Sequence, residues 1–238
     1  AAHKSPYRSG EVPAGVKLLT MTVDVQGNRL VFVIRGWGAG STSWLISAGE
    51  IMGRTSDTEV WDELAELVST PIGGKRLRLV LVDSGYRPGK PVNLPVNRIY
   101  AFARRFPRLV RAPKGRHRQA KPVISPMIDV KEDGHQKTYG LELLWLDTDY
   151  GKSWVHERVR WPLATRGSWY LPGDITIDYC KQIVSEARVR KPSGLPQWVP
   201  RSKDNHFLDC EAMQAAAAHL LNVHLIRGPD PVGTADAV

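Results

Sequence analysis

The sequence predicts one α/β domain in which a mixed central sheet is flanked by helices. Three observations indicate this class. Two β-rich runs, residues 16–25 and 29–38, are joined by a tight Gln-Gly-Asn turn, and a third run at 41–53 completes an antiparallel meander. An amphipathic segment over 57–70 then predicts a helix. The continuously apolar run Leu-Val-Leu-Val at 79–82 is typical of a buried parallel strand, so the chain starts in the order βββαβ.

The remaining elements follow from periodicity and from glycine and proline breaks. Helices are predicted around 95–105, over 148–160 and over 178–189, and strands over 107–113 and 141–147, with a possible short strand near Trp198. The alanine-rich segment 205–222 has the highest intrinsic helix propensity in the chain. Residues 1–16 are predicted to be a linker, 17–226 the folded domain, and 227–238 a flexible tail.

Composition limits the classes of protein that this chain can be. Its 238 residues are 42% hydrophobic and 24% charged, which is ordinary for a globular domain and argues against disorder or a fibrous repeat. No apolar run approaches the roughly 20 residues of a membrane-spanning helix, and residues 1–15 lack the apolar stretch of a secretory signal. Two cysteines without metal-ligand spacing make a zinc site or a disulfide scaffold improbable. We expect a soluble intracellular protein without a membrane partner.

The net charge of +9 is concentrated in one stretch, residues 101–122, which contains no acidic residue. Such a patch binds polyanions by displacing their counterions, and phosphates are the usual target. A solvated basic loop is the plainer alternative. The basic residues of this stretch are Arg104, Arg105, Arg108, Arg111, Lys114, Arg116, Arg118 and Lys121.

Three carboxylates interrupt patterns that are otherwise buried. Asp24 ends the first apolar strand, Asp83 ends the most hydrophobic strand, and Asp209 lies in the alanine-rich helix. Met213 and Ala216 follow Asp209 at helical spacing, and the small alanines allow the helix to approach the sheet closely. If the helix crosses both strands, the three carboxylates meet at one edge of the sheet.

Clustered carboxylates repel one another and favour a bound cation, and hard oxygen ligands select Mg²⁺ or Mn²⁺. Two such ions support phosphodiester hydrolysis, so an acidic pocket beside a basic surface is typical of a nuclease. Each acid also has a structural explanation: Asp24 and Asp83 suit turns, and Asp209 suits the first turn of a helix.

The βββαβ order, with acids on the first strand, the fourth strand and a late helix, resembles the ribonuclease H-like fold. More closely, residues 23–30, 36–46, 81–86 and 205–217, with Lys114-Gly115, resemble the C-terminal nuclease domain of phage large terminase subunits of the lambda GpA type. The resemblance extends from about Val12 to about Leu221.

This resemblance implies a metal-dependent DNA endonuclease that cuts concatemeric viral DNA during genome packaging in the host cell cytoplasm. It implies two Mg²⁺ or Mn²⁺ ions on Asp24, Asp83 and Asp209, and double-stranded DNA held by Lys114, Arg116, Arg118 and, more weakly, Lys121. His206 is a candidate for a supporting role beside Asp209, although a solvent-facing histidine is the plainer expectation. Glu50, Asp204 and Glu211 are reserve ligands at most.

The resemblance also implies partners outside this chain: an ATPase motor domain, a small terminase subunit and a portal. The motor needs a phosphate loop, and the sequence has none, because Leu146 stands where the first glycine before Gly151-Lys152-Ser153 is required. We therefore expect no ATP site, and the linker-like start is consistent with excision just after a motor.

Two other functions remain open at this point. Another ribonuclease H-like enzyme, such as a junction resolvase or a transposase core, would prefer four-way junctions. A non-catalytic DNA-binding or assembly module would bind DNA in a salt-sensitive way without hydrolysing it.

Overall fold

The computed structural model describes residues 3–85, 97–132, 135–190, 192, 194 and 196–229. The strands are β1 (Lys4–Ser5), β2 (Leu18–Val25), β3 (Arg29–Trp37), β4 (Ser43–Met52), β5 (Leu77–Val82), β6 (Val110–Arg116), β7 (Val123–Ile124), β8 (Met127–Glu132), β9 (His135–Asp147), β10 (Trp169–Pro172), β11 (Glu186–Arg190) and β12 (Pro196–Pro200). The helices are α1 (Glu59–Ser69), α2 (Arg98–Arg105), α3 (Thr148–Arg158), α4 (Ile177–Ile183) and α5 (His206–Leu220), with short 3-10 helices at Ala39–Ser41 and Val223–Leu225.

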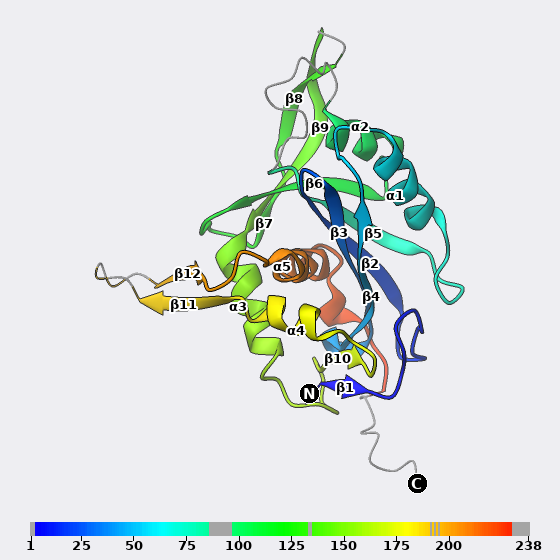
Figure 1. Ribbon diagram of the computed structural model, residues 1–238, viewed down its shortest axis with the longest axis vertical. Coiled ribbons are helices and arrows are strands. Elements are labelled where there is room, and N and C mark those ends of the chain that lie inside the picture. Colours follow the sequence, from blue (N-terminus) through cyan, green and yellow to red (C-terminus); the bar gives the residue numbers. More distant parts are fainter. Residues whose placement is uncertain are drawn as a thin grey trace.

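The central sheet is mixed (Figure 1). Within the described residues its strand order is β1-β10-β4-β3-β2-β5-β6-β9-β7, and β8 pairs with β9. Strands β2, β3 and β4 form the predicted antiparallel meander, and β5 lies parallel to β2 and to β6. The predicted α/β class with its βββαβ start and flanking helices is therefore confirmed. Because β2, β5 and β6 are parallel neighbours, their carboxyl ends share one edge of the sheet.

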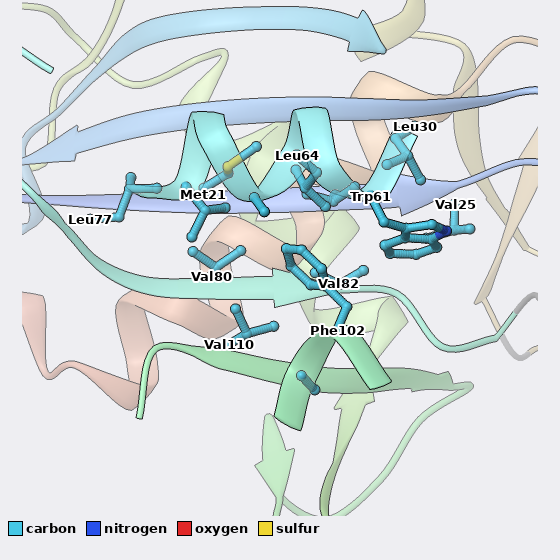
Figure 2. Close-up of a cluster of buried hydrophobic side chains, with 14 of the residues drawn as sticks. Met21, Val25, Leu30, Trp61, Leu64, Leu77, Val80, Val82, Phe102 and Val110 are labelled. Atoms are coloured by element: carbon cyan, nitrogen blue, oxygen red, sulfur yellow. The ribbon is translucent and has the colours of Figure 1, made fainter. Parts of the chain in front are cut away.

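Helices α1 and α2 cover one face of the sheet. The predicted stripe of α1 is buried there, with Val60, Leu64 and Val68 at most 4% exposed and Leu67 partly buried. These side chains pack on strand residues such as Met21 and on residues of α2 (Figure 2). Burial of one helical stripe, at about 25 cal/mol per Å² of apolar surface, stabilises α1 against the sheet.

Helix α5 covers the other face, together with α3 and α4 (Figure 1). It is buried nearly all round, which is why its sequence shows no amphipathic stripe. Polar contacts fix its position on the sheet: Thr22 Oγ1 donates a hydrogen bond to the Cys210 carbonyl at 3.0 Å, and Gln214 Nε2 donates to the Val33 carbonyl at 3.0 Å. Buried hydrogen bonds of this kind disfavour sliding or rotation of the helix, because a shift leaves polar groups unpaired.

A fully buried ion pair anchors the same helix. The guanidinium of Arg35, on β3, donates to both carboxylate oxygens of Glu211, with Nη2–Oε1 at 2.9 Å and Nε–Oε2 at 3.0 Å. Tyr179 also donates to Glu211 Oε1 at 2.6 Å, and Ser43 Oγ accepts from Arg35 Nη1 at 3.1 Å. Glu211 is therefore a core residue that holds α5 on the sheet.

The structure differs from the predicted elements in several places. The helix predicted over 178–189 ends at Ile183, and Glu186–Arg190 instead pairs as β11 with β12 in a separate antiparallel hairpin. Charged residues alternate there with Ala187 and Val189 and pair with Pro196–Pro200, and Val184, in the turn between α4 and β11, is 52% exposed. Strand β6 continues to Arg116, into the predicted basic loop, and β10 was not predicted. Residues 95–96 of the predicted helix 95–105 lie outside the described residues.

Residues 3–16 lie against the edge of the sheet. Strand β1 pairs with β10, and the Tyr7 hydroxyl donates to the Leu45 carbonyl at 2.9 Å. The assignment of residues 1–16 as a linker to another domain stays a prediction, as does that of 227–238 as a tail, most of which lies outside the described residues. Among the described helices, none is both long and apolar enough to cross a membrane.

A close contact between α3 and α5 depends on Gly151. A Cβ at this position would lie 2.8 Å from the Ala212 carbonyl oxygen, which is backbone and cannot easily move. We expect Gly151→Val to destabilise the protein by about 1–3 kcal/mol through overpacking, measured by urea unfolding. Ser153→Val, on the same helix beside an open cleft, is the control for the helix propensity of valine. Equal stability of the two variants would contradict a tight helix contact.

Candidate active site

A pocket of about 280 Å³ lies where β2 and β5 end beneath the first turns of α5. The three predicted carboxylates all line it, each from a different element: Asp24 from β2, Asp83 after β5, and Asp209 from α5. The sheet brings the first two together because parallel strands end at the same edge. The other residues that line the pocket are Gly85, Gly115, Leu146, Asp147, Thr148, Lys152, Ala212 and Met213.

Asp24 is held by two neighbours. Its side chain is 9% exposed, and Oδ2 accepts a hydrogen bond from Gln26 Nε2 at 2.8 Å. The same oxygen lies 2.8 Å from His206 Nδ1. This hydrogen bond raises the pKa of His206 against the opposing effect of burial, so the imidazole favours its charged form beside Asp24. His206 therefore does not simply face solvent, as the plainer expectation had it, and it contacts Asp24 rather than Asp209.

Of the three carboxyl groups, that of Asp83 has the largest shift in pKa. Burial is the main cause that raises its pKa to about 6; the Gly85 N–H opposes the rise, and the negative charges of Asp24 and Asp209 add to it. That N–H donates to Asp83 Oδ1 at 3.1 Å, and the Asp83 peptide N–H donates to the Val23 carbonyl at 2.8 Å. The second bond extends the β2–β5 pairing by one residue and fixes Asp83 at the pocket.

Asp209 forms an ion pair that sequence reasoning missed. Its Oδ1 lies 3.1 Å from Lys152 Nζ, which also lies 2.5 Å from Glu186 Oε1. Burial raises the pKa of Asp209, and Lys152 opposes that rise. Burial alone would lower the pKa of Lys152, but its two carboxylate partners outweigh burial and raise it. In the sequence, Lys152 stood out only as part of an incomplete phosphate loop, so no local pattern marked it as a site residue.

The donor set suits a hard divalent cation, although the side chains do not converge on one point. Within the described residues, no three histidine, cysteine or acidic side chains are close enough together to hold an ion. Asp24 is turned to His206 and Asp209 to Lys152, so protein cations take up part of their charge. The pKa of Asp83 is raised mainly by burial and also by the charges of Asp24 and Asp209, so its charged form is destabilised in the pocket. A cation bound to carboxylate oxygens would relieve that repulsion.

The basic segment borders the pocket through Gly115. Lys114 and Arg116 flank this glycine on β6 and lie over the Trp145 ring, 5.8 Å from Nζ and 3.4 Å from Cζ to the ring centroid. Because side chains alternate along a strand, both point to the face opposite Gly115. Arg118 and Lys121 follow in an exposed loop. None of the four predicted DNA-binding residues lines the pocket, although Gly115, between Lys114 and Arg116, does.

Asp147 holds this loop beside the pocket. Its Oδ2 accepts from the Gln119 N–H at 2.9 Å, and its Oδ1 accepts from the Tyr150 N–H at 2.9 Å as the N-cap of α3. Asp149, in the first turn of the same helix, pairs with Arg188 at 3.0 Å.

The reserve ligands lie elsewhere. Glu50 pairs with Arg29 at 3.4 Å, Glu211 is in the core with Arg35, and Asp204 is exposed in the loop before α5. None of the three lines the pocket.

Comparison with known proteins gives one consistent result. Residues 1–229 match the family described as terminase large subunit gpA, endonuclease domain. The large terminase subunit of Escherichia phage lambda is 25% identical over 237 residues, which covers 92% of this chain and 35% of the lambda protein. The chain thus spans about a third of the length of that relative.

Two solved structures are similar to this chain in fold, with TM-scores below 0.5. The large terminase nuclease from thermophilic phage G20c has a TM-score of 0.45 at 11% identity, over 88% of this chain and 92% of that one. The K428A nuclease domain of the large terminase subunit gp2 of bacterial virus Sf6, with manganese, has a TM-score of 0.48 at 10% identity, over 84% and 88% of the two chains.

Proposed function

The chain belongs to the family of terminase large subunit gpA endonuclease domains, and on that premise we propose that it is a metal-dependent DNA endonuclease that cuts concatemeric viral DNA during genome packaging. The observation that carries the proposal is the single pocket lined by Asp24, Asp83 and Asp209. Three carboxylates from separate elements, one with a pKa raised to about 6, are costly to keep together without a cationic ligand.

We assign the carboxylates as ligands of two Mg²⁺ or Mn²⁺ ions. Asp24, Asp83 and Asp209 would hold these ions through their carboxylate oxygens, with Asp24 as the ligand shared between them. When bound, the ions would activate a water and stabilise the leaving oxygen of an in-line phosphodiester displacement. This assignment needs no serine, cysteine or histidine nucleophile, in keeping with a pocket whose reactive groups are acids and one lysine.

The neighbouring side chains position these ligands. His206 and Gln26 both contact Asp24 Oδ2, and we assign the other carboxylate oxygen, Oδ1, to the ligand. Lys152 balances the charge of Asp209 and Glu186. We propose that a cation at Asp209 competes with Lys152 for the same carboxylate.

Contacts to the DNA backbone are assigned to Lys114, Arg116, Arg118 and Lys121. Two features support this. Lys114 and Arg116 flank Gly115, which lines the pocket. Arg118 and Lys121 lie in the loop that Asp147 anchors by accepting a hydrogen bond from the Gln119 N–H. Contacts of this kind with phosphates give affinity without sequence specificity.

The wider setting is also a proposal, because the chain spans only about a third of its lambda relative. We propose that it works in the host cell cytoplasm as part of a longer subunit with an ATPase motor, alongside a small terminase subunit and a portal. ATP-driven translocation then belongs to the motor.

The decisive experiment is nicking of supercoiled plasmid DNA. We expect cleavage with Mn²⁺ or Mg²⁺ and none in EDTA, and a loss of about 10²- to 10³-fold in rate for Asp24→Asn, because a bridging ligand stabilises charge at both ions. Asp62→Asn, an exposed acid on α1, should cleave like the wild type.

Two outcomes contradict the proposal. Cleavage that persists in EDTA or in Asp24→Asn removes the metal assignment. Salt-sensitive DNA binding without any hydrolysis would indicate a DNA-binding or assembly module, and a preference for four-way junctions would indicate a resolvase-like enzyme.

A further inference from the structure

A second cleft, of about 600 Å³, lies at the base of the β11–β12 hairpin. Its walls come from the C-terminal half of α3, the end of α4, both strands of the hairpin and Arg201 just after β12. The hairpin extends from the body of the molecule beside α3 and α5, and its two strands are not part of the central sheet (Figure 1). A two-stranded hairpin with no sheet behind it is marginally stable alone, so the packing at its base matters.

The cleft carries an excess of positive charge. Three guanidiniums line it, from Arg160, Arg188 and Arg201, against the carboxylates of Glu157 and Glu186. Glu186 is buried and already bound by Lys152 and Asn205, the latter at 2.7 Å. Arg188 pairs with Asp149, whereas the exposed side chains of Arg160 and Arg201 have no ion pair within the described part of the chain. Two cations are therefore free to bind an anion.

Two ring nitrogens in the cleft also lack partners. His156 Nε2 and Trp198 Nε1 are buried without a hydrogen bond to any described residue, and the two rings lie 4.6 Å apart between centroids. Unpaired buried polar atoms are costly and uncommon in native structures. Burial lowers the pKa of His156, and the charges of Arg160 and Arg201 lower it further, which indicates a positive local potential. An anionic oxygen would be stabilised by that potential.

Contacts connect this cleft to the carboxylate pocket. Glu186 lines the cleft and holds Lys152, and Lys152 lines the carboxylate pocket and holds Asp209. The chain also passes from β12 through Arg201 directly into α5, where His206 and Asp209 lie. The linings of the two sites are therefore joined through the Lys152–Glu186 ion pair.

We propose that this cleft binds a backbone phosphate of the DNA, away from the phosphate that is cut, through Arg160 and Arg201. The inference rests on the proposed function for its ligand, since the chemistry it recognises is a phosphodiester in a chain. It adds a DNA contact that lies outside the basic segment 101–122.

The test is duplex binding by the full chain in EDTA, measured by fluorescence anisotropy at several salt concentrations. We expect the double variant Arg160→Ala/Arg201→Ala to bind about tenfold more weakly, and the slope of log affinity against log salt to fall by about 2 in magnitude, because each phosphate contact contributes about 0.9. Arg54→Ala, which removes an 81% exposed arginine next to Asp57, is the matched control and should bind like the wild type. An affinity and salt slope equal to the wild type overturn the proposal.

A second arm separates a DNA backbone from free phosphate. Inorganic phosphate is added to wild type and double variant, and thermal unfolding is recorded. Stabilisation of the wild type alone, with unchanged duplex binding by the variant, would identify a free-phosphate site and overturn the DNA contact. The side chains of Arg160 and Arg201 are exposed, so the urea midpoint of the double variant should equal that of the wild type. If the midpoint shifts, and Arg160→Ala and Arg201→Ala alone each bind DNA as weakly as the double variant, the loss of binding comes from unfolding and the proposal fails.

Because binding is measured without metal, the result is independent of cleavage. A wild type that binds through the two arginines but never cuts DNA would remove the proposed function and keep this contact. An enzyme that cuts normally while the double variant binds normally would remove this contact alone.

Discussion

Asp83→Asn should abolish cleavage and at the same time make the metal-free protein more stable. We expect a loss of about 10²- to 10³-fold in plasmid cleavage, because one ion loses its carboxylate. Above neutral pH we expect a gain of about 2 kcal/mol in the free energy of unfolding, because a carboxyl with a pKa of about 6 instead of 3.8 is destabilised when charged. Asparagine keeps an oxygen for the Gly85 N–H at this position.

The stability of the wild type should fall as the pH rises. The folded state of the wild type binds the Asp83 proton more tightly than the unfolded state, so its stability falls as pH rises from about 4 through 6. The difference between variant and wild type should therefore be small near pH 4 and complete above pH 7. Urea unfolding in EDTA at both pH values measures it.

Added Mg²⁺ should narrow the difference in stability between the two proteins. It should stabilise the wild type at pH 7.5 and have little effect on Asp83→Asn. Asp62→Asn, whose carboxylate is 68% exposed, should change neither stability nor cleavage appreciably. A variant at residue 83 that is less stable than the wild type at pH 7.5, or a difference independent of pH, would show that the buried charge is not costly.

Glu211→Ala should have the largest effect on stability. It leaves the Arg35 guanidinium fully buried without its carboxylate, and removing one partner of such a pair costs about 3–5 kcal/mol. This is a large part of the roughly 5–15 kcal/mol that stabilises an ordinary domain. The Tyr179 hydroxyl loses its acceptor as well. His219→Ala, exposed on the same helix, should be nearly neutral in urea unfolding.

A double variant keeps this prediction testable if the single variant does not fold. Arg35→Met with Glu211→Leu removes both charges, and we expect it to recover much of the lost stability, because replacing a buried pair by apolar groups is often close to neutral. A Glu211→Ala protein that unfolds at the wild-type urea concentration would contradict a structural role for the pair.

Much of the fold is predictable because its first half is patterned locally. The meander at β2–β4, the stripe of α1 and the apolar β5 all follow periodicities that depend only on neighbouring residues. The second half was harder. Ala187 and Val189 suit either the apolar side of a helix or a strand, and only pairing with β12 decides for the strand.

The candidate site divides in the same way. Asp24 and Asp83 stand out because an acid at the end of an apolar strand conflicts with burial, and Asp209 because it begins an otherwise apolar helix. Lys152 and Glu186 carry no such signal, since each lies among ordinary polar residues of its own element. They meet Asp209 only because α3, α5 and β11 pack around one point.

The amino-acid sequence by itself determined which residues are acidic, basic or apolar at each strand end and helix face, and thereby the class of the fold and the three candidate ligands. Only the tertiary structure decided that these ligands line one pocket, that Glu211 turns to Arg35, and that a lysine and a hairpin complete the surroundings. The physical reason is that patterns reflect the burial of each residue, whereas a site is made of contacts between residues far apart in the chain.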